Sequence, residues 1–140
     1  MSAADDDQWL LDAVGPFSRL LGFRLVEVST DGATMEAHPT EEHANGGGIL
    51  HGGYLSTLLD SSTGWAVHAS LPKGVRAPHI QLTVQYLRMA VPGKPLTCRA
   101  RAVTVGRRVA AAEAEITQDG KPVARGVSSH AVLTPPTPAG

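Results

Sequence analysis

The chain has 140 residues, a length typical of one domain with a single hydrophobic core. Its formal net charge is −1 and only 4% of its residues are aromatic, so the basic, aromatic-rich surface of a nucleic-acid-binding protein is not expected. The single cysteine excludes an intrachain disulfide, and the acidic start MSAADDDQ lacks a secretory signal pattern. No apolar run approaches the roughly 20 residues that span a bilayer. We therefore expect a cytoplasmic protein with neither nucleic-acid nor membrane partners.

Length and pattern together predict one domain over residues 8–133. The acidic residues 1–7 are expected to be disordered, and residues 134–140 to form a flexible tail. Apolar residues recur at near-helical spacing over residues 9–21, which predicts a short first helix. Pro16 limits or splits that helix, because proline is poorly tolerated in a helix interior.

A hairpin and a long helix are predicted next. β-branched and aromatic residues favour strands over residues 23–30 and 33–40, and Asp31–Gly32 between them is a strong turn signal. A glycine-rich loop follows, and from His51 to about Ala69 the apolar residues recur at the period of an α-helix. Small residues lie on several sides of this helix, so we expect the helix to be enclosed, with the sheet curled about it.

The rest of the chain predicts only strands. The segment HIQLTVQYL alternates sharply, with its apolar residues on one face and His79 among the polar residues on the other. The whole order predicts an α+β protein, in which one substantial helix covers one face of a mostly antiparallel sheet. The four strands of this part are expected over residues 79–87, 96–105, 107–118 and 123–133.

The stretch HANGGGILHGG, residues 43–53, brings five glycines directly before the long helix. Glycines let backbone N–H groups approach a ligand closely, and a helix N-terminus favours negative charge. Such a place can hold a phosphate, or the oxyanion that forms when a carbonyl group is attacked. The phosphate-loop signature needs Lys and then Ser or Thr after its last glycine, whereas Tyr54 and Leu55 follow Gly53 here, which disfavours a nucleotide site.

One acid, Asp60, stands in the middle of the long helix, with the small residues Ser56 and Gly64 on the same side. An acid in such a place is either hydrogen-bonded to neighbouring serines or functional, and the sequence favours neither. Gly52 and Asp60 are separated by roughly 12 Å along a helix, so one helix cannot easily aim both at one carbonyl group. If both act in one site, the helix N-terminus comes from one subunit and Asp60 from another. That condition predicts a dimer with composite sites.

Motifs for other kinds of site are absent. The sequence has no Gly-x-Ser-x-Gly elbow, CxxC or HExxH, and His43 and His51 near the loop lack a third ligand at regular spacing. We therefore expect no metal site, and Cys98 is interpreted as a small buried apolar residue. Five arginines of the C-terminal third could meet a phosphorylated small molecule or lie on solvated strand faces: Arg99, Arg101, Arg107, Arg108 and Arg125.

The stretch HANGGGILHGGYLSTLLD resembles the signature of hotdog-fold acyl-CoA thioesterases of the phenylacetate-pathway and 4-hydroxybenzoyl-CoA type. The resemblance extends over roughly residues 16–133 and implies a hotdog fold, in which a curved antiparallel sheet wraps around a central helix. It also implies a dimer, often paired into a tetramer, that hydrolyses an acyl-CoA to free acid and CoA without a metal or organic cofactor. The matching positions are Asn45, Gly48, His51, Gly52, Gly53 and Asp60.

The resemblance assigns roles to these residues. Asp60 becomes the nucleophile or the general base, and the backbone N–H of Gly52 polarises the thioester carbonyl. Asn45 helps to hold the carbonyl or the water, and His51 orients the loop. Some relatives carry Ser or Thr, in contact with the attacking water, where an ungapped alignment places His79, which favours a surface or pocket-lining histidine here. Substrate contacts are expected at Gly48, Gly53, Thr63 and His79, and CoA contacts at Arg88, Arg107 and Arg108.

Three functions remain open at this point. The first is hydrolysis of an aryl or medium-chain acyl-CoA. The second is acyl-CoA binding without hydrolysis on the same fold, against which the intact Asn45, Gly52 and Asp60 count. The third is a hotdog hydratase or dehydratase, which usually has an acid–histidine arrangement that is absent here. Residues that could line the acyl pocket, or simply belong to the core, are Tyr54, Leu58, Leu59, Trp65 and Tyr86.

Overall fold

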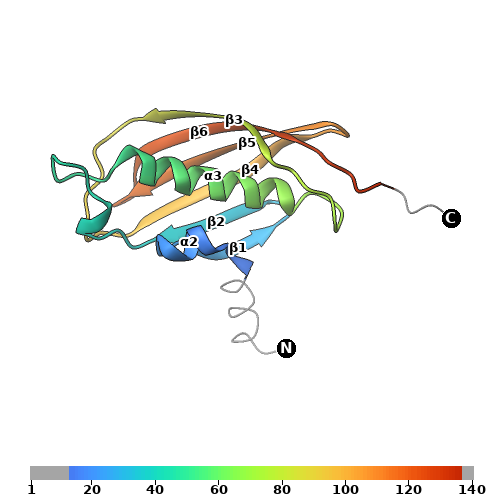
Figure 1. Cartoon of the computed structure of the whole chain (residues 1–140). Coiled ribbons are helices and arrows are strands. Elements are labelled where there is room, and N and C mark those ends of the chain that lie inside the picture. Colours follow the sequence, from blue (N-terminus) through green and yellow to red (C-terminus); the bar gives the residue numbers. More distant parts are fainter. Residues whose placement is uncertain (1–12, 137–140) are drawn as a thin grey trace.

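The computed structural model describes residues 13–136 and consists of one antiparallel sheet crossed by one long helix (Figure 1). The helical elements are α2 (Pro16–Leu20), the 3₁₀ helix η1 (Glu41–His43) and α3 (Gly52–His68). The strands are β1 (Arg24–Ser29), β2 (Gly32–Ala37), β3 (His79–Tyr86), β4 (Leu96–Val105), β5 (Val109–Gln118) and β6 (Lys121–Ala131).

The strand order in the sheet is β1-β2-β4-β5-β6-β3, and every neighbouring pair is antiparallel. The chain leaves β2, crosses one face of the sheet as α3 and returns as β3 at the far edge (Figure 1). The predicted α+β class and the hotdog arrangement of a curved sheet around one long helix are confirmed. Both β1 and β3 are therefore edge strands of this chain.

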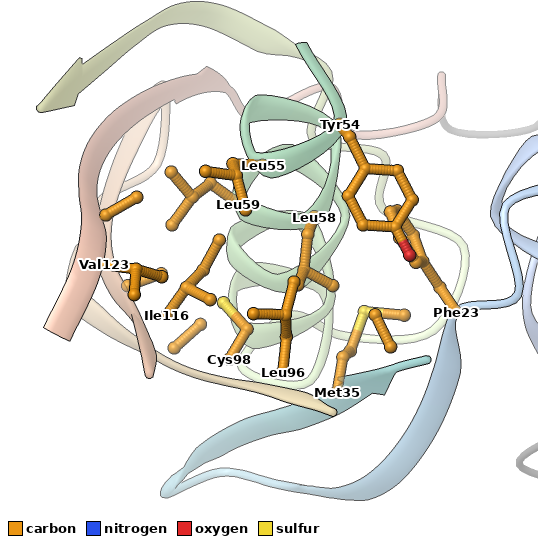
Figure 2. Close-up of a cluster of buried hydrophobic side chains, with 14 of the residues drawn as sticks. Phe23, Met35, Tyr54, Leu55, Leu58, Leu59, Leu96, Cys98, Ile116 and Val123 are labelled. Atoms are coloured by element: carbon orange, nitrogen blue, oxygen red, sulfur yellow. The ribbon is translucent and has the colours of Figure 1, made fainter. Parts of the chain in front are cut away.

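The core lies between α3 and the sheet. Leu58 and Leu59 of α3 are fully buried against side chains of the central strands, among them Leu96 and Ile116 (Figure 2). Each leucine buried in this way contributes about 1.5–3 kcal/mol relative to an exposed one. Cys98 also lies in this core, as predicted, and burial raises the pKa of its thiol to about 12. This packing fixes which side of α3 faces the sheet and which side faces away.

One expectation about α3 is wrong: this chain encloses only one side of the helix. Thr63, which shares a side of the helical wheel with Asp60, is fully buried, whereas the Asp60 side chain is 51% exposed. Of the other small residues near Asp60, Ser56, Ser61 and Gly64 are half-buried, so this chain covers that side of α3 only in part.

The N-terminal region differs slightly from its prediction. Pro16 occupies the first turn of α2, where its missing N–H would have had no partner in any case, so it begins the helix. The predicted helical residues before residue 13 lie outside the described residues, as do the expected disordered segment 1–7 and the last four residues of the tail. The 3₁₀ helix η1 was not predicted; Thr40 begins it by accepting a hydrogen bond from the Glu42 N–H.

A β-bulge changes the face on which His79 lies. Strict alternation would place His79 and Leu82 on opposite faces of β3. The pairing of β3 with β6, however, shifts register between His79 and Gln81. The extra residue turns His79 towards α3, where its ring contacts Thr63. The sequence-based assignment of His79 to the polar face of the strand is therefore wrong.

Among the helices of residues 13–136, none has the length and apolar character needed to cross a membrane.

Candidate active site

The glycine-rich loop ends in a capped helix N-terminus. His51 is the N-cap of α3, and its Nδ1 accepts a hydrogen bond from the Gly53 N–H at 2.8 Å. The N–H of Gly52, one residue earlier, has no hydrogen-bond partner within residues 13–136. It is one of the unpaired donors that every helix N-terminus leaves, at the positive end of the helix dipole. The site thus offers one available backbone donor of the kind that stabilises an oxyanion.

Asn45 organises the loop before this N-terminus. Its Oδ1 accepts a hydrogen bond from the Gly47 N–H at 2.9 Å, and its backbone carbonyl accepts one from the Gly48 N–H at 3.0 Å. Gly48 has a φ of 82°, a conformation that favours glycine. These bonds hold the side-chain oxygen of Asn45, so the donor that it can offer to a ligand is its Nδ2 amide.

Tyr86, at the end of β3, lies against the start of α3. Its hydroxyl donates to the Gly52 carbonyl at 3.1 Å and bonds the Ser56 hydroxyl at 2.6 Å. Tyr86, Gly52 and Arg88 border a hollow of about 520 Å³ that also includes Asn45 and apolar side chains such as Met89. The sequence is compatible with Tyr86 either as a pocket-lining residue or as a core residue. In the structure its side chain is 56% exposed and lines this hollow.

Asp60 borders two other hollows, one towards the N-terminal end of α3 and one towards its C-terminal end. The first, of about 540 Å³, lies between α2 and α3 and includes Phe17 and Leu82. The second, of about 360 Å³, includes Trp65, His68 and His79. Phe17 and His68 were not predicted as site residues. The approach of α2 to α3 brings Phe17 near the acid, whereas His68 lies about two turns after Asp60 on α3 itself.

His79 faces Asp60 across one of these hollows. Its Nδ1 lies 3.7 Å from Asp60 Oδ2, and its Nε2 lies 2.9 Å from the Thr63 hydroxyl. Burial lowers the pKa of His79 below its ordinary value, and the nearby His130 lowers it further, whereas the Asp60 charge acts in the opposite direction. Of the residues expected to contact substrate, Thr63 is fully buried and reaches the site only through His79.

One chain does not bring the two ends of the candidate site together. The hollow at Asn45 and Gly52 does not include Asp60, and neither hollow at Asp60 includes Gly52. The two residues lie two helical turns apart on α3, roughly 12 Å along its axis. The backbone N–H groups of Gly48 and Gly53, also expected to contact substrate, donate inside the loop.

The arginines expected to contact CoA lie in two places. Arg88 is at the Gly52 end of α3. Arg107 and Arg108 are in the β4–β5 turn, near the C-terminal end of α3 (Figure 1). Two further arginines form ion pairs across neighbouring strands at 2.6 Å, Arg101 with Glu113 and Arg125 with Glu115. Both side chains are more than half exposed, and both border a hollow of about 620 Å³ on the open face of the sheet.

Comparison with known proteins decides between the kinds of chemistry that this geometry allows. The model of the thioesterase superfamily matches residues 47–124, more than half of the chain, from the glycine-rich loop to β6. The chain belongs to the thioesterase superfamily. It is therefore a thioester hydrolase, as the resemblance implied.

Relatives of this thioesterase support the assignment. A putative esterase of Halobacterium salinarum is 37% identical over 121 residues, covering 81% of this chain and 79% of its own. Human acyl-coenzyme A thioesterase 13 is 28% identical over 113 residues, covering 79% and 80%. Among solved structures, a putative thioesterase of Ralstonia eutropha, described as phenylacetic acid degradation-related, is 31% identical with a TM-score of 0.80 and covers 86% of this chain and 93% of its own.

Proposed function

We propose that this thioesterase hydrolyses an aryl or medium-chain acyl-CoA to the free acid and CoA. The observation that carries the proposal is that α3 bears two groups suited to this reaction, the available Gly52 N–H and the solvent-exposed Asp60 carboxylate. One stabilises an oxyanion and the other takes a proton from water, so no serine nucleophile is required. The name of the human relative supports an acyl-CoA substrate, and the relation of the Ralstonia protein to phenylacetic acid degradation supports an aryl acyl group.

The proposed reaction begins with a water beside Asp60, which acts as general base. The water oxygen bonds to the thioester carbonyl carbon while Asp60 takes its proton, and the oxyanion forms against the Gly52 N–H at the positive end of α3. The C–S bond then breaks, and the sulfur leaves with its electron pair and takes the proton that Asp60 holds, which regenerates the carboxylate. The exposure of Asp60 beside two hollows favours this role over attack by the carboxylate itself, because water reaches the acid freely. We propose no step through a metal or organic cofactor.

The separation of Gly52 and Asp60 supports a composite site. We propose that two chains pair so that Gly52 and Asn45 of one protomer meet Asp60 of its partner. The edge strand β3 is suited to this pairing: it is eight residues long, and one of its edges has no strand beside it within residues 13–136. Ile80 of this strand is 62% exposed, and unpaired edges with exposed apolar residues are ready to add another strand. Two such dimers could pair further into a tetramer.

The arginines fit this pairing as contacts for CoA. Arg88 lies beside Gly52, where the sulfur end of the substrate must lie, and the phosphates of CoA are strong acceptors for guanidinium groups. Arg107 and Arg108 lie near the opposite end of α3, so we propose that they reach the same substrate only from the partner protomer. We propose Arg88 as the first CoA contact and Arg107 and Arg108 as contacts from the partner.

Release of free CoA from a panel of acyl-CoAs tests the proposal, using phenylacetyl, hydroxybenzoyl, short and long aliphatic groups. We expect turnover of at least one aryl or medium-chain member, and a loss of about 100-fold or more in Asp60→Asn, the scale of a general base. Asp31→Asn, an exposed acid in the β1–β2 turn, is the matched control and should keep full activity. Tight binding of acyl-CoA without release would instead support a non-hydrolytic binding protein.

A further inference from the structure

His79 stands beside the acid that the proposed function requires, and four groups surround its ring. On α3, Asp60 faces Nδ1 and the Thr63 hydroxyl contacts Nε2. His68, also on α3, borders the same hollow. On β6, the ring of His130 packs against it with centroids 4.1 Å apart. The His79 ring is therefore held between α3 and β6, and its Nδ1 faces Asp60.

The hydrogen bonds of Thr63 determine which nitrogen carries the proton of the neutral ring. A hydroxyl has one hydrogen, and that of Thr63 is directed to the helix, 2.8 Å from the Leu59 carbonyl and 3.1 Å from the Asp60 carbonyl. The Thr63 oxygen can then only accept from His79, so Nε2 carries the hydrogen. Nδ1 is left with a lone pair that faces Asp60 Oδ2 at 3.7 Å, too far for a direct hydrogen bond.

His130 cannot replace His79 in this arrangement. Its Nδ1 lies 3.1 Å from the Ala77 carbonyl, which can only accept, so that nitrogen is the donor. Its Nε2 lies 2.7 Å from the Ser128 hydroxyl and accepts from it. Both nitrogens are therefore occupied within the fold, and the residue is fully buried. Of the two stacked histidines, His79, 20% exposed and with one open nitrogen, is the one that can reach a ligand.

We propose that His79 Nδ1 is the second proton acceptor of the site, and that the attacking water donates one hydrogen to it and the other to Asp60. This inference rests on the proposed function, because it names the partner of the water that Asp60 activates. Two acceptors on one water direct its lone pair away from both of them and towards the carbonyl carbon. Asp60 takes the proton when the C–O bond forms, while the hydrogen bond to His79 holds the hydroxyl that remains.

Protonation of His79 removes this acceptor. The charged ring presents an N–H to Asp60 and no longer accepts from the water, and its ion pair with the carboxylate competes with the water for that carboxylate. Burial holds the pKa of His79 below its ordinary value of 6.5, with His130 acting in the same direction and Asp60 against it. The neutral, active form therefore dominates at pH 7 and above, and hydrolysis is lost as the pH falls below 6.5.

The pH profile of kcat/KM in two variants tests this role. Asn places a side-chain oxygen near the position of Nδ1 but does not titrate, so His79→Asn should stay within about tenfold of wild type at pH 8 and lose the acid limb. His79→Ala has no acceptor and should fall about 100-fold, the lower end of general-base effects. His38→Asn is the matched control. His38 Nε2 lies 4.0 Å from Glu36 Oε2, a similar histidine–acid pair, and this pair is not part of the site. An unchanged acid limb in His79→Asn would overturn the proposal.

A second measurement does not depend on turnover. Long-range ¹H–¹⁵N correlation spectra of histidine-labelled protein should show His79 as the Nε2–H tautomer, titrating below pH 6.5. In Asp60→Asn the titration midpoint should move to lower pH, because the carboxylate that favours the charged ring is gone. A proton on Nδ1 at pH 8, or a midpoint indifferent to Asp60, contradicts the role of His79 even if hydrolysis is found. Absence of hydrolysis with the expected spectra would instead contradict the proposed function alone.

Discussion

Tyr86 and Gly52 hold each other in place where β3 meets the start of α3. The Tyr86 hydroxyl donates to the Gly52 carbonyl at 3.1 Å, and a Cβ added to Gly52 would lie 3.1 Å from the Tyr86 ring. The side chain of the edge strand therefore holds the peptide group that follows Gly52, directly after the one whose N–H we propose as the oxyanion donor. This contact makes the geometry of the helix N-terminus depend on β3, the strand that we propose pairs with a second chain.

The first prediction concerns this close contact. Gly52→Ala should lower kcat by about tenfold or more, because the added methyl displaces either the Tyr86 ring or the Gly52 N–H, and small displacements at a reacting centre are costly. Steady-state kinetics on the best acyl-CoA measures the loss. Gly46→Ala in the same loop has no atom within 4 Å of its added Cβ and should leave kcat unchanged. Equal effects of the two substitutions would show that the Tyr86 contact does not matter.

The second prediction concerns the cap of α3. His51→Ala removes the acceptor of the Gly53 N–H, so the free energy of unfolding should fall by about 1 kcal/mol, as for other lost N-caps. His51→Asn supplies a favoured N-cap side chain and should restore that stability. Urea denaturation of both variants provides the measurement. If Asn behaves like Ala, the ring acts through packing and the capping bond is not what stabilises the helix.

The third prediction tests the composite site by mixing two inactive variants. Asp60→Asn and Asn45→Ala are each expected to be inactive as homodimers, but a mixed dimer joins the intact loop of one chain to the intact acid of the other. Random reassociation should recover about a quarter of wild-type activity, because half of the dimers are mixed and each has one intact site. The activity of co-refolded protein, measured beside each variant refolded alone, decides the question. No recovery would mean that Asn45 and Asp60 act within one chain.

The fourth prediction concerns stability at alkaline pH. Burial raises the pKa of Tyr54 and that of Cys98 to about 12, from ordinary values of 10.0 and 9.0. Both groups contribute full stability below pH 9, and that contribution is lost as the pH rises towards 12, since the unfolded chain releases these protons first. Urea midpoints at pH 8, 9.5 and 10.5 should fall in that order. Midpoints that stay constant would contradict the burial of these two groups.

The thiol of Cys98 offers a separate check on the same core. Because the residue is buried and its pKa is raised, a thiol reagent at pH 8 should react only slowly with the folded protein. In concentrated urea the reaction should be fast. Rapid labelling without denaturant would show that the core opens around β4.

The periodicity of the sequence determined most of the fold. Leu55, Leu58 and Leu59 recur at helical spacing because the sheet buries one side of α3, and alternation in LTCRARAVTV predicted β4 over residues 96–105, as observed. Local patterns succeed here because each reflects burial of one face of one element. The glycine-rich loop and the position of Asp60 were readable for a similar reason, since both depend on residues that are neighbours along the chain.

Tertiary structure alone decided which residues gather at the acid. The bulge before Gln81 turns His79 to the face of β3 that touches α3, and alternation along the strand cannot reveal an extra residue whose origin is the pairing with β6. Phe17, at the start of α2, reaches Asp60 only because α2 packs beside α3. The exposure of one side of α3 also could not be predicted, because small residues suit either a buried helix or a surface that contacts another chain. The sequence thus determined the elements and the reacting acid, whereas the groups around that acid depended on how distant elements pack together.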